Sequence, residues 1–448
     1  MPQRTFADLG LASTIQLTLE DEGYEHPTPI QAQAIPHILA GRDVLGVAQT
    51  GTGKTAAFAL PILQRLRDAR RPSRCCAKVL ILTPTRELAI QIDDNFANYS
   101  RNLTCVHRVI FGGVGKRPQI QGMARGVDVL VATPGRLLDL MGDGYVDLSE
   151  VGVFVLDEAD RMLDMGFIHD VRRVLKELPA ERQTLLFSAT MPATITQLSK
   201  KILRDPIRVE VTPQATTVER IEQCVLMVEK GDKPPLLAHL LKAPDIDRAL
   251  IFTRTKHGAN RVVQKLSRGG IVAAAIHGNK SQGARQRALK SFRDGNIRFL
   301  VATDIAARGI DVDGISHVFN FDLPNIPESY VHRIGRTARA GRSGVAISFC
   351  AADERGYLRD IERLIREKVE VLTGHPYESH EAERKPEPQG RGGGGRGGGR
   401  GGGGGGGRAG GGRGRAGGGG GRGGGGGRGG GRGGGGRGGG RGGGGGRR

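Results

Sequence analysis

The sequence predicts an α/β protein with two folded units built on parallel β-sheets, followed by a disordered Arg/Gly-rich tail. Short runs of β-branched residues alternate with helical patterns throughout residues 1–372, which favours α/β units over an all-β or all-α chain. A chain of 448 residues is too long for one ordinary domain and can bury two sizeable hydrophobic cores. Residues 390–448 comprise 44 Gly, 13 Arg and two Ala, so this segment has no side chains from which to build a third core.

Two series of short apolar runs are predicted to be strands, one before and one after Thr212-Pro213-Gln214. Each series covers roughly 150 to 210 residues, which is the size of one domain. We therefore expect one domain at residues 1–210, a linker at 211–218, a second domain at 219–375, and a further linker with the tail at 376–448. The strands of the first series are predicted at 43–47, 79–82, 127–131, 151–156 and 184–187, and those of the second at 249–252, 272–276, 299–302, 317–321 and 345–349.

Polar residues follow directly after many of these runs. In an open parallel sheet, ligands bind in the crevice beyond the carboxyl ends of the strands, so the chemistry is expected at one edge of each sheet. The last folded element is predicted to be a helix over 354–366. Its apolar face is expected to carry Leu358, Ile361, Leu364 and Ile365.

Most of the positive charge lies in the tail. The formal net charge is +20, and the 13 tail arginines leave +7 for the other 389 residues. Such a tail suits an anionic polymer such as nucleic acid. A membrane surface fits less well, because no amphipathic basic helix or lipidation signal accompanies the charge. A solvated spacer that binds nothing is the alternative.

Cysteine usage indicates a reducing compartment. The five cysteines form no C-x-x-C pair, and the eleven histidines show no metal-ligand spacing, so we expect buried reduced thiols rather than disulfides or zinc ligands. The start of the chain has no signal-peptide pattern, and no apolar run reaches about eighteen residues. The expected location is therefore the cytoplasm, without a membrane partner.

A phosphate-binding loop is predicted between the first strand and the helix that follows it. Gly51 and Gly53 allow backbone N–H groups to approach phosphate oxygens, and Lys54 reaches the terminal phosphates. The hydroxyl group of Thr55 is expected to ligate Mg²⁺. The usual pattern begins with Gly, and position 48 is Ala. The loop reads Ala48-Gln49-Thr50-Gly51-Thr52-Gly53-Lys54-Thr55.

The strand at 151–156 ends in two adjacent carboxylates. Asp157 can hold Mg²⁺ through the water shell of the ion, and Glu158 can orient and deprotonate an attacking water molecule. Alternatively, Asp157 and Asp160 only cap the next helix. The phosphate loop about one hundred residues upstream favours the hydrolytic interpretation.

Two arginines in the second half are candidates for stabilising a phosphoryl-transfer transition state. Arg336 and Arg339 lie three residues apart, so a helical turn would present both to one target. Alternatively, they belong to a solvated helix face. Because the second half has no phosphate loop of its own, these arginines could serve a site shared between the halves.

Together these motifs resemble those of the DEAD-box RNA helicases, whose name is spelled by Asp157-Glu158-Ala159-Asp160. The resemblance covers about residues 3–372. Within the family, segments 254–260 and 277–285 are most similar to the bacterial RhlE-type members, and Ala338 stands where many members have Gly. The remaining motifs are Phe6 with 23–31 (the Q motif), 84–89, Gly112-Gly113, 133–136, 188–190, 251–253, 282–285, 302–311 and 332–339.

The resemblance implies two tandem RecA-like domains that close around ATP. Gln31 would then read the adenine edge, Phe6 would stack on the ring, and Asp311 would contact the ribose. Arg336 and Arg339 would reach the γ-phosphate. ATP with Mg²⁺ is the implied cofactor pair.

The resemblance also implies RNA binding across both domains. Hydroxyl groups, glycines and a few arginines suit contacts to phosphates and 2′-hydroxyls, which hold a strand without reading its bases. Ser188, Thr190 and His332 would couple hydrolysis to strand separation. The implied RNA contacts are Pro84, Thr85, Arg86, Gly113, Thr133, Arg136, Thr253, Gly278, Thr303 and Asp304.

The expected function is that of an ATP-dependent RNA helicase, an RNA-stimulated ATP hydrolase that locally unwinds short duplexes or remodels RNA–protein complexes. Ribosome-assembly or RNA-decay complexes are the candidate partners, and the tail would add nonspecific affinity for RNA. A non-unwinding RNA clamp or annealing scaffold is the second hypothesis. A DNA translocase is the third.

Overall fold

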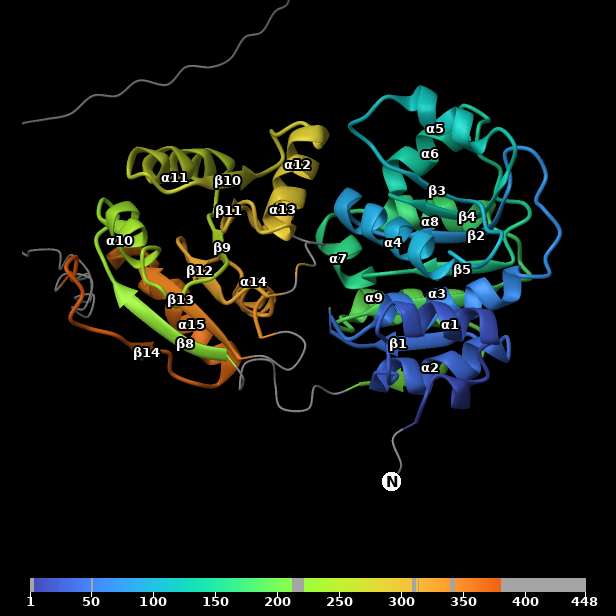
Figure 1. Ribbon diagram of the computed structural model, residues 1–448, viewed down its shortest axis with the longest axis horizontal. Helices are drawn as coiled ribbons and strands as arrows, with labels where there is room; N and C mark the ends of the chain where they lie inside the picture. The colour runs from blue at the N-terminus through green and yellow to red at the C-terminus, as the bar shows by residue number, and fades with distance from the viewer. Residues whose placement is uncertain are drawn as a thin grey trace, which may run out of the picture. The chain divides into compact units, whose positions relative to one another are not determined.

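The computed structural model describes residues 4–49, 51–211, 221–307, 312, 314–338 and 343–379. Within these residues the chain forms two seven-stranded sheets in which every neighbouring pair of strands is parallel (Figure 1). The predicted α/β class is therefore confirmed. The tail and the segment 212–220 lie outside the described residues.

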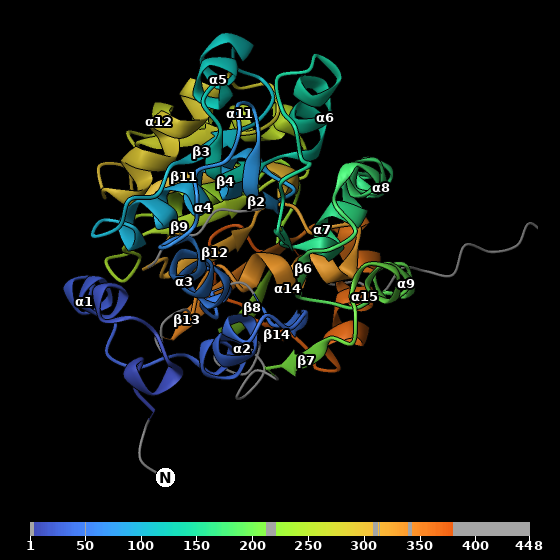
Figure 2. The same ribbon diagram turned by 90° about the vertical axis from the view of Figure 1, so that its right-hand side faces the viewer.

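The first sheet has the strand order β3-β4-β2-β5-β6-β1-β7. Helices α1 to α4 pack on one face of this sheet and helices α5 to α9 pack on the other, and each face forms a hydrophobic core with the strands (Figure 2). A short 3₁₀-helix, η1 (Ala7–Leu9), precedes α1. The strands are β1 (Val44–Val47), β2 (Ala77–Leu82), β3 (His107–Ile110), β4 (Val127–Ala132), β5 (Val153–Leu156), β6 (Gln183–Ser188) and β7 (Ile207–Glu210). The helices are α1 (Ser13–Asp21), α2 (Pro29–Leu39), α3 (Lys54–Leu66), α4 (Arg86–Tyr99), α5 (Lys116–Met123), α6 (Pro134–Gly142), α7 (Ala159–Asp164), α8 (Ile168–Glu177) and α9 (Ala193–Ile202).

The second sheet has the order β10-β11-β9-β12-β13-β8-β14. Helices α10 and α11 pack on one face, and α12 to α15 pack on the other. The strands are β8 (Ile221–Met227), β9 (Ala249–Phe252), β10 (Ala273–Ile276), β11 (Phe299–Ala302), β12 (His317–Asn320), β13 (Gly344–Cys350) and β14 (Glu370–Val371). The helices are α10 (Lys233–Leu240), α11 (Lys256–Arg268), α12 (Gln282–Arg293), α13 (Asp304–Ala307), α14 (Pro327–Ile334) and α15 (Arg355–Ile365), with the 3₁₀-helix η2 (Ala352–Glu354) before α15.

The two sheets have the same topology. Each strand of the second sheet occupies the place of the strand seven numbers earlier, so β8 corresponds to β1, β12 to β5 and β13 to β6. Positions that follow corresponding strands can therefore be compared directly between the sheets.

The central strands form where the sequence is continuously apolar. All residues of β5 and β9 are buried, as expected for parallel strands that are covered on both faces. Polar residues begin several helices at the strand ends. The Thr85 hydroxyl accepts a hydrogen bond from the backbone N–H of Leu88 at 3.3 Å, and Thr255 does the same for Gly258 at 3.0 Å.

Four strands were missing from the sequence-based prediction, namely β3, β7, β8 and β14. Strands β3, β7 and β14 are partly or wholly exposed, and charged residues interrupt the apolar pattern from which strands are predicted. The predicted C-terminal helix is present as α15, where Leu358 and Ile361 are buried. Leu364, expected on the same face, is 41% exposed.

The cysteines are free thiols, and Cys76, Cys224 and Cys350 are buried. Burial raises the pKa of the Cys224 and Cys350 thiols to about 12. Within the described ranges, no group of three His, Cys, Asp or Glu side chains is arranged to hold a metal ion. No helix in the part of the chain that the structure describes is long and apolar enough to cross a membrane.

Candidate functional site

Polar residues gather at the carboxyl edge of the first sheet, after three neighbouring strands. The loop after β1 leads into α3, the loop after β5 leads into α7, and the loop after β6 leads toward α9. Because parallel strands end at the same edge, these loops form one polar surface. The predicted phosphate loop and both predicted carboxylates lie there.

The phosphate loop has the backbone geometry that anion binding requires. Gly51 and Gly53 have φ angles of 83° and 89°, in the left-handed region that suits glycine. Lys54 is the first residue of α3, so the free N–H groups of that helix face the loop. The Lys54 side chain is buried, and its Nζ donates to the carbonyl oxygen of Ala48 at 2.8 Å. Thr50 lies outside the described residues.

The predicted adenine-reading glutamine packs directly on this loop. Gln31 is 1% exposed, and its Nε2 donates to the carbonyl oxygen of Gly53 at 3.1 Å. Its Oε1 accepts from the backbone N–H of Thr28, the N-cap residue of α2, at 2.9 Å. A Cβ atom at position 53 would lie 2.4 Å from Gln31 Nε2. The start of α2 and the phosphate loop are therefore fitted to one another.

Phe6 lines a cavity of about 420 Å³ together with Gly23 and Tyr24. The rings of Phe6 and Tyr24 meet edge to face, with centroids 6.4 Å apart and an interplanar angle of 74°. A cavity of this size and lining can accept a flat aromatic group. This arrangement is compatible with the stacking role expected for Phe6.

Asp157 is buried directly after β5, with 2% of its surface exposed. Burial raises the pKa of its carboxyl group to about 7, although the charge of Lys54 acts in the opposite direction. A cation beside this carboxyl group would favour its ionised form. Magnesium prefers oxygen ligands and keeps several waters, so the carboxylate of Asp157, the hydroxyl of Thr55 and phosphate oxygens form a suitable donor set.

Glu158 is held by an arginine that the sequence did not single out. Its backbone adopts the left-handed conformation with φ 53°, which is uncommon for a residue with a side chain. Both carboxylate oxygens lie 2.8 Å from Nη1 of Arg161, and the two side chains are 5% and 3% exposed. Arg161 therefore fixes the direction of the Glu158 carboxylate.

The loops after β5 and β6 are joined by hydrogen bonds. Thr190 donates to Asp160 Oδ2 through both its backbone N–H and its hydroxyl group, each at 2.8 Å. Ser188 Oγ donates to the carbonyl oxygen of Thr190 at 2.7 Å and accepts from the N–H of Asp160 at 3.2 Å. Burial alone raises the pKa of Asp160, but the Thr190 hydrogen bonds and the charges of Lys54 and Arg161 outweigh it, so the pKa lies below its ordinary value.

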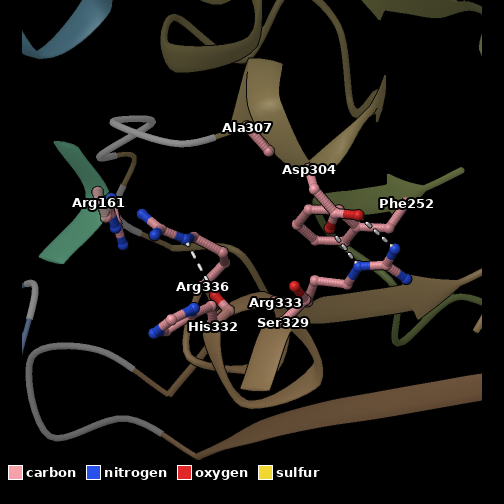
Figure 3. A pocket seen from close by; sticks show the side chains of 8 residues that line it. All are labelled: Arg161, Phe252, Asp304, Ala307, Ser329, His332, Arg333 and Arg336. Atoms are coloured by element: carbon pink, nitrogen blue, oxygen red, sulfur yellow. Dashed lines mark hydrogen bonds and ion pairs between the residues drawn. The ribbon is translucent and has the colours of Figure 1, made fainter. Parts of the chain in front are cut away.

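Arg336 lines a small cavity that also includes Arg161 and His332 (Figure 3). Figure 3 shows the Arg336 side chain extending toward Arg161, and its Nε donates to the carbonyl oxygen of His332 at 3.3 Å. One predicted arginine finger therefore lines the same cavity as Arg161, a residue of α7. The other finger, Arg339, and the predicted ribose ligand Asp311 lie outside the described residues.

The predicted RNA contacts of the first half lie together at the ends of β2, β3 and β4. The Arg86 guanidinium covers Gly113 so closely that a Cβ atom there would lie 2.1 Å from Nη1. Arg136 Nη2 donates to the carbonyl oxygen of Val114 at 3.1 Å. The other residues of this set are Pro84, Thr85 and Thr133.

Asp304, one of the predicted RNA contacts of the second half, is engaged by an arginine. Its oxygens lie 2.5 Å from Nε and 2.8 Å from Nη2 of Arg333, which is 1% exposed. The guanidinium of Arg333 also lies over the ring of Phe252, 5.1 Å from its centroid. Asp304 therefore orients Arg333. Thr253 is buried directly after β9, Thr303 directly follows β11, and Gly278 lies just after β10.

Three charged residues that make contacts in this region, Arg161, Arg333 and Glu87, received no role of their own from the sequence. Arg333 lies inside the motif 332–339, where only its neighbours received roles, and Arg161 directly follows the motif 157–160. Glu87 accepts from Gln282 Nε2 at 3.0 Å and pairs with Arg285 Nη2 at 2.9 Å. The sequence signal for this contact was the segment 282–285, which had been recognised as a motif without an assigned partner.

Comparisons with known proteins match both halves of the chain. The family model described as DEAD/DEAH box helicase matches residues 28–198, and the helicase conserved C-terminal domain matches residues 232–341. The chain is 46% identical to the ATP-dependent RNA helicase DeaD of Buchnera aphidicola over 82% of its own length and 61% of that protein. It is 44% identical to the DEAD-box ATP-dependent RNA helicase CshA of Geobacillus kaustophilus, covering 82% of this chain and 78% of the relative.

Solved structures show the same architecture. Saccharomyces cerevisiae Dbp5 bound to RNA and ADP BeF3 matches with a TM-score of 0.74 and 33% identity, over 82% of this chain and 95% of that one. A DEAD box protein from Methanococcus jannaschii matches with a TM-score of 0.50 and 39% identity, over 82% and 99% of the two chains. The two tandem RecA-like domains expected from the sequence are thereby confirmed.

Proposed function

We propose that this chain, a member of the DEAD-box family of ATP-dependent RNA helicases, hydrolyses ATP. The reaction would take place at the carboxyl edge of the first sheet. The energy of that cycle would locally separate short RNA duplexes or remodel RNA–protein complexes. One observation carries the proposal most strongly. The phosphate-loop lysine, the two carboxylates after β5 and the Ser188–Thr190 loop meet at one edge of one sheet.

The phosphate loop and Lys54 would hold the triphosphate, while Gln31 and Phe6 select the adenine base. The contact between Gln31 and Gly53 supports this assignment, because it links base recognition to the position of the phosphates. Thr55 and Asp157 would hold Mg²⁺, which neutralises charge on the phosphate oxygens when it is bound.

Glu158 would orient and deprotonate the attacking water molecule. Arg161 supports this role because it restricts the carboxylate to one direction. Arg336 and Arg339 would place positive charge on the γ-phosphoryl group, and Asp311 would bind the ribose. The cavity shared by Arg161, His332 and Arg336 supports the assignment of Arg336.

Hydrolysis would be coupled to RNA through the loop after β6. Ser188 and Thr190 bind Asp160, which lies two residues from the proposed base, so a shift of either loop moves the other. His332 lines the same cavity as Arg161 and would relay the state of the second domain.

RNA would lie across the ends of the strands in both domains and would be held by its backbone. The clustering of Arg86, Gly113 and Arg136 supports a phosphate-binding surface in the first half. In the second half, Asp304 would act through Arg333, which it orients. Binding of this kind does not depend on base sequence. The Arg/Gly tail would add nonspecific affinity for RNA.

From the sequence we also propose a RhlE-type resemblance of segments 254–260 and 277–285, domain boundaries at 1–210 and 219–375, a cytoplasmic location, and partners in ribosome assembly or RNA decay. The relatives named above carry the names DeaD and CshA instead of RhlE.

A Glu158→Gln variant tests the proposed hydrolytic role. The amide keeps the size of the side chain but cannot take a proton from water, so RNA-stimulated ATP turnover should fall by at least a hundredfold. ATP-dependent retention of RNA should persist, because binding does not need the base. Glu177→Gln, an exposed position of α8, is the matched control. Unchanged ATP turnover in Glu158→Gln would exclude this carboxylate as the base.

A further inference from the structure

The second sheet contains a buried lysine at the position that corresponds to the phosphate-loop lysine. Lys54 begins the helix after β1, and Lys233 begins the helix after β8, the corresponding strand. Lys233 is 1% exposed, although its sheet has no phosphate loop. A buried ammonium group needs a counter-charge and hydrogen-bond acceptors, so the partners of Lys233 show which anionic group takes the place of a phosphate here.

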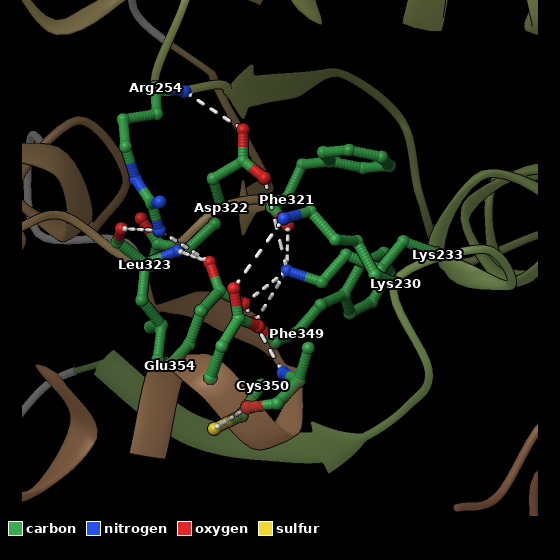
Figure 4. Close-up of polar contacts among 12 residues, drawn as sticks. Lys230, Lys233, Arg254, Phe321, Asp322, Leu323, Phe349, Cys350 and Glu354 are labelled. Carbon is green, nitrogen blue, oxygen red and sulfur yellow. Dashed lines mark hydrogen bonds and ion pairs between the residues drawn. The ribbon is translucent and has the colours of Figure 1, made fainter. Parts of the chain in front are cut away.

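The partner of Lys233 is a carboxylate of the same chain, Glu354 (Figure 4). Glu354 is 3% exposed and lies in η2, after β13. Strand β13 stands between β8 and β12, as β6 stands between β1 and β5 in the first sheet. The Lys233 Nζ also donates to the carbonyl oxygens of Phe321 at 2.9 Å and Phe349 at 3.4 Å.

Four donors from different segments converge on the Glu354 carboxylate. Besides Lys233, Arg254 Nη2 lies 2.6 Å from Oε1. The backbone N–H of Leu323 donates to Oε1, and that of Ala351 donates to Oε2, each at 3.2 Å. Two cationic groups and two backbone N–H groups around one oxyanion form the donor set that proteins use for phosphate and carboxylate ligands.

The loop after β8 could not bind a nucleotide as the first sheet does. Gly231 is its one glycine, and none of residues 228–232, all of which the structure describes, has a positive φ. Pro234 and Pro235 in the first turn of α10 lack the N–H groups that the start of α3 offers to an anion. Any affinity of this part of the second sheet for an anion therefore comes from the four donors around Glu354, not from the loop after β8.

We propose that the Glu354 carboxylate fills an anion-binding site in the second sheet, at the place that corresponds to the phosphate site of the first sheet. The carboxylate satisfies Lys233 and Arg254 from within the chain, so that free phosphate or a nucleotide phosphate does not occupy them. Each chain then binds a single nucleotide, at the first sheet. Asp322, 3.9 Å from Lys233, completes a cluster whose charges balance.

A Glu354→Ala variant should open this site to small oxyanions. Removing one partner of a buried pair is strongly destabilising, so in chloride buffer the Tm should fall by roughly 10 °C. Formate supplies the lost carboxylate and inorganic phosphate supplies the equivalent oxyanion. Either should recover several degrees in a saturable manner at constant ionic strength.

The controls separate this effect from general stabilisation by salts. Wild-type protein and Asp353→Ala, which changes the exposed neighbouring carboxylate, should show the same small shift in formate as in chloride. A Glu354→Ala protein that gains no more from formate or phosphate than the wild type would overturn the proposal. If the variant does not fold in chloride, its refolding yield is compared with and without formate. A higher yield in formate supports the proposal, and an equal yield overturns it. Two ATP molecules bound per wild-type chain would also contradict it.

Discussion

At the scale of single residues, the site depends on buried charges that are each held by named partners. Asp160 illustrates this because it binds no substrate in the proposed mechanism, yet its carboxylate accepts two hydrogen bonds from Thr190 and its backbone N–H donates to Ser188 Oγ. Hydrogen bonds to a charged group contribute about 1.5 to 3 kcal/mol each, so this contact ties the two loops firmly. In the proposed mechanism, Asp160 therefore serves to hold the loops after β5 and β6 in position relative to each other.

Replacing Thr190 by Val tests that positional role. Valine keeps the shape of the side chain but removes the hydroxyl that donates to Asp160 at 2.8 Å. We expect ATP turnover to stay within a few-fold of wild type, while ATP-dependent separation of a short RNA duplex falls at least tenfold. Both rates should be measured on one preparation.

Thr196→Val is the matched control for this change. Thr196 lies on α9 nearby, and its hydroxyl donates only to the backbone carbonyl oxygen of Met191 at 3.3 Å. If Thr190→Val lost hydrolysis and strand separation in the same proportion, Thr190 would belong to the chemical step, and the coupling assignment would be wrong.

At the scale of elements, the chemistry is placed by where strands stop and helices start. The sequence was sufficient to predict the central strands, because β5 and β9 are uninterrupted apolar runs between polar residues. It also placed the phosphate loop, since glycine spacing directly encodes the left-handed backbone. Edge strands such as β7, with Ile, Arg, Val and Glu in alternation, were missed because one face is open to solvent.

Long-range partners could not be predicted from the sequence. Nothing in the local pattern says that Gln31 reaches Gly53, or that Glu354 pairs with Lys233 across 121 positions. Such pairings depend on which strands become neighbours in the sheet. Arg161 is an intermediate case, because a residue three positions after Glu158 on a helical turn faces it, and this spacing could have identified it.

Replacing Gly53 by Ala tests the fit between α2 and the phosphate loop. The added Cβ would lie 2.4 Å from Gln31 Nε2 and 3.0 Å from Thr28 Oγ1, at a φ of 89° that disfavours a side chain. We expect ATP to bind at least tenfold more weakly, as measured by equilibrium titration. Gly142→Ala is the control, because a Cβ there has no neighbour within 4 Å. Unchanged ATP affinity would show that this contact does not position the nucleotide.

At the scale of the whole molecule, one topology is used twice for different purposes. In the proposed arrangement, the first sheet keeps an anion site at its carboxyl edge, and Glu354 fills the corresponding position of the second sheet, which carries Arg336 and further proposed RNA contacts. A single nucleotide site that needs residues from both halves would bind ATP fully only when RNA and both domains are engaged. With this division of roles, two sheets of the same topology would hydrolyse one ATP per chain.

The central claim is that ATP hydrolysis at this site drives separation of RNA strands. The most direct test is a strand-displacement assay on a short RNA duplex with ATP, with ADP and without nucleotide, using wild type and Glu158→Gln. The account predicts multiple-turnover separation only for wild type with ATP, and little effect on a DNA duplex of the same sequence. Strand annealing without ATP-dependent separation would contradict it and would favour an RNA clamp, and equal activity on DNA would favour a translocase.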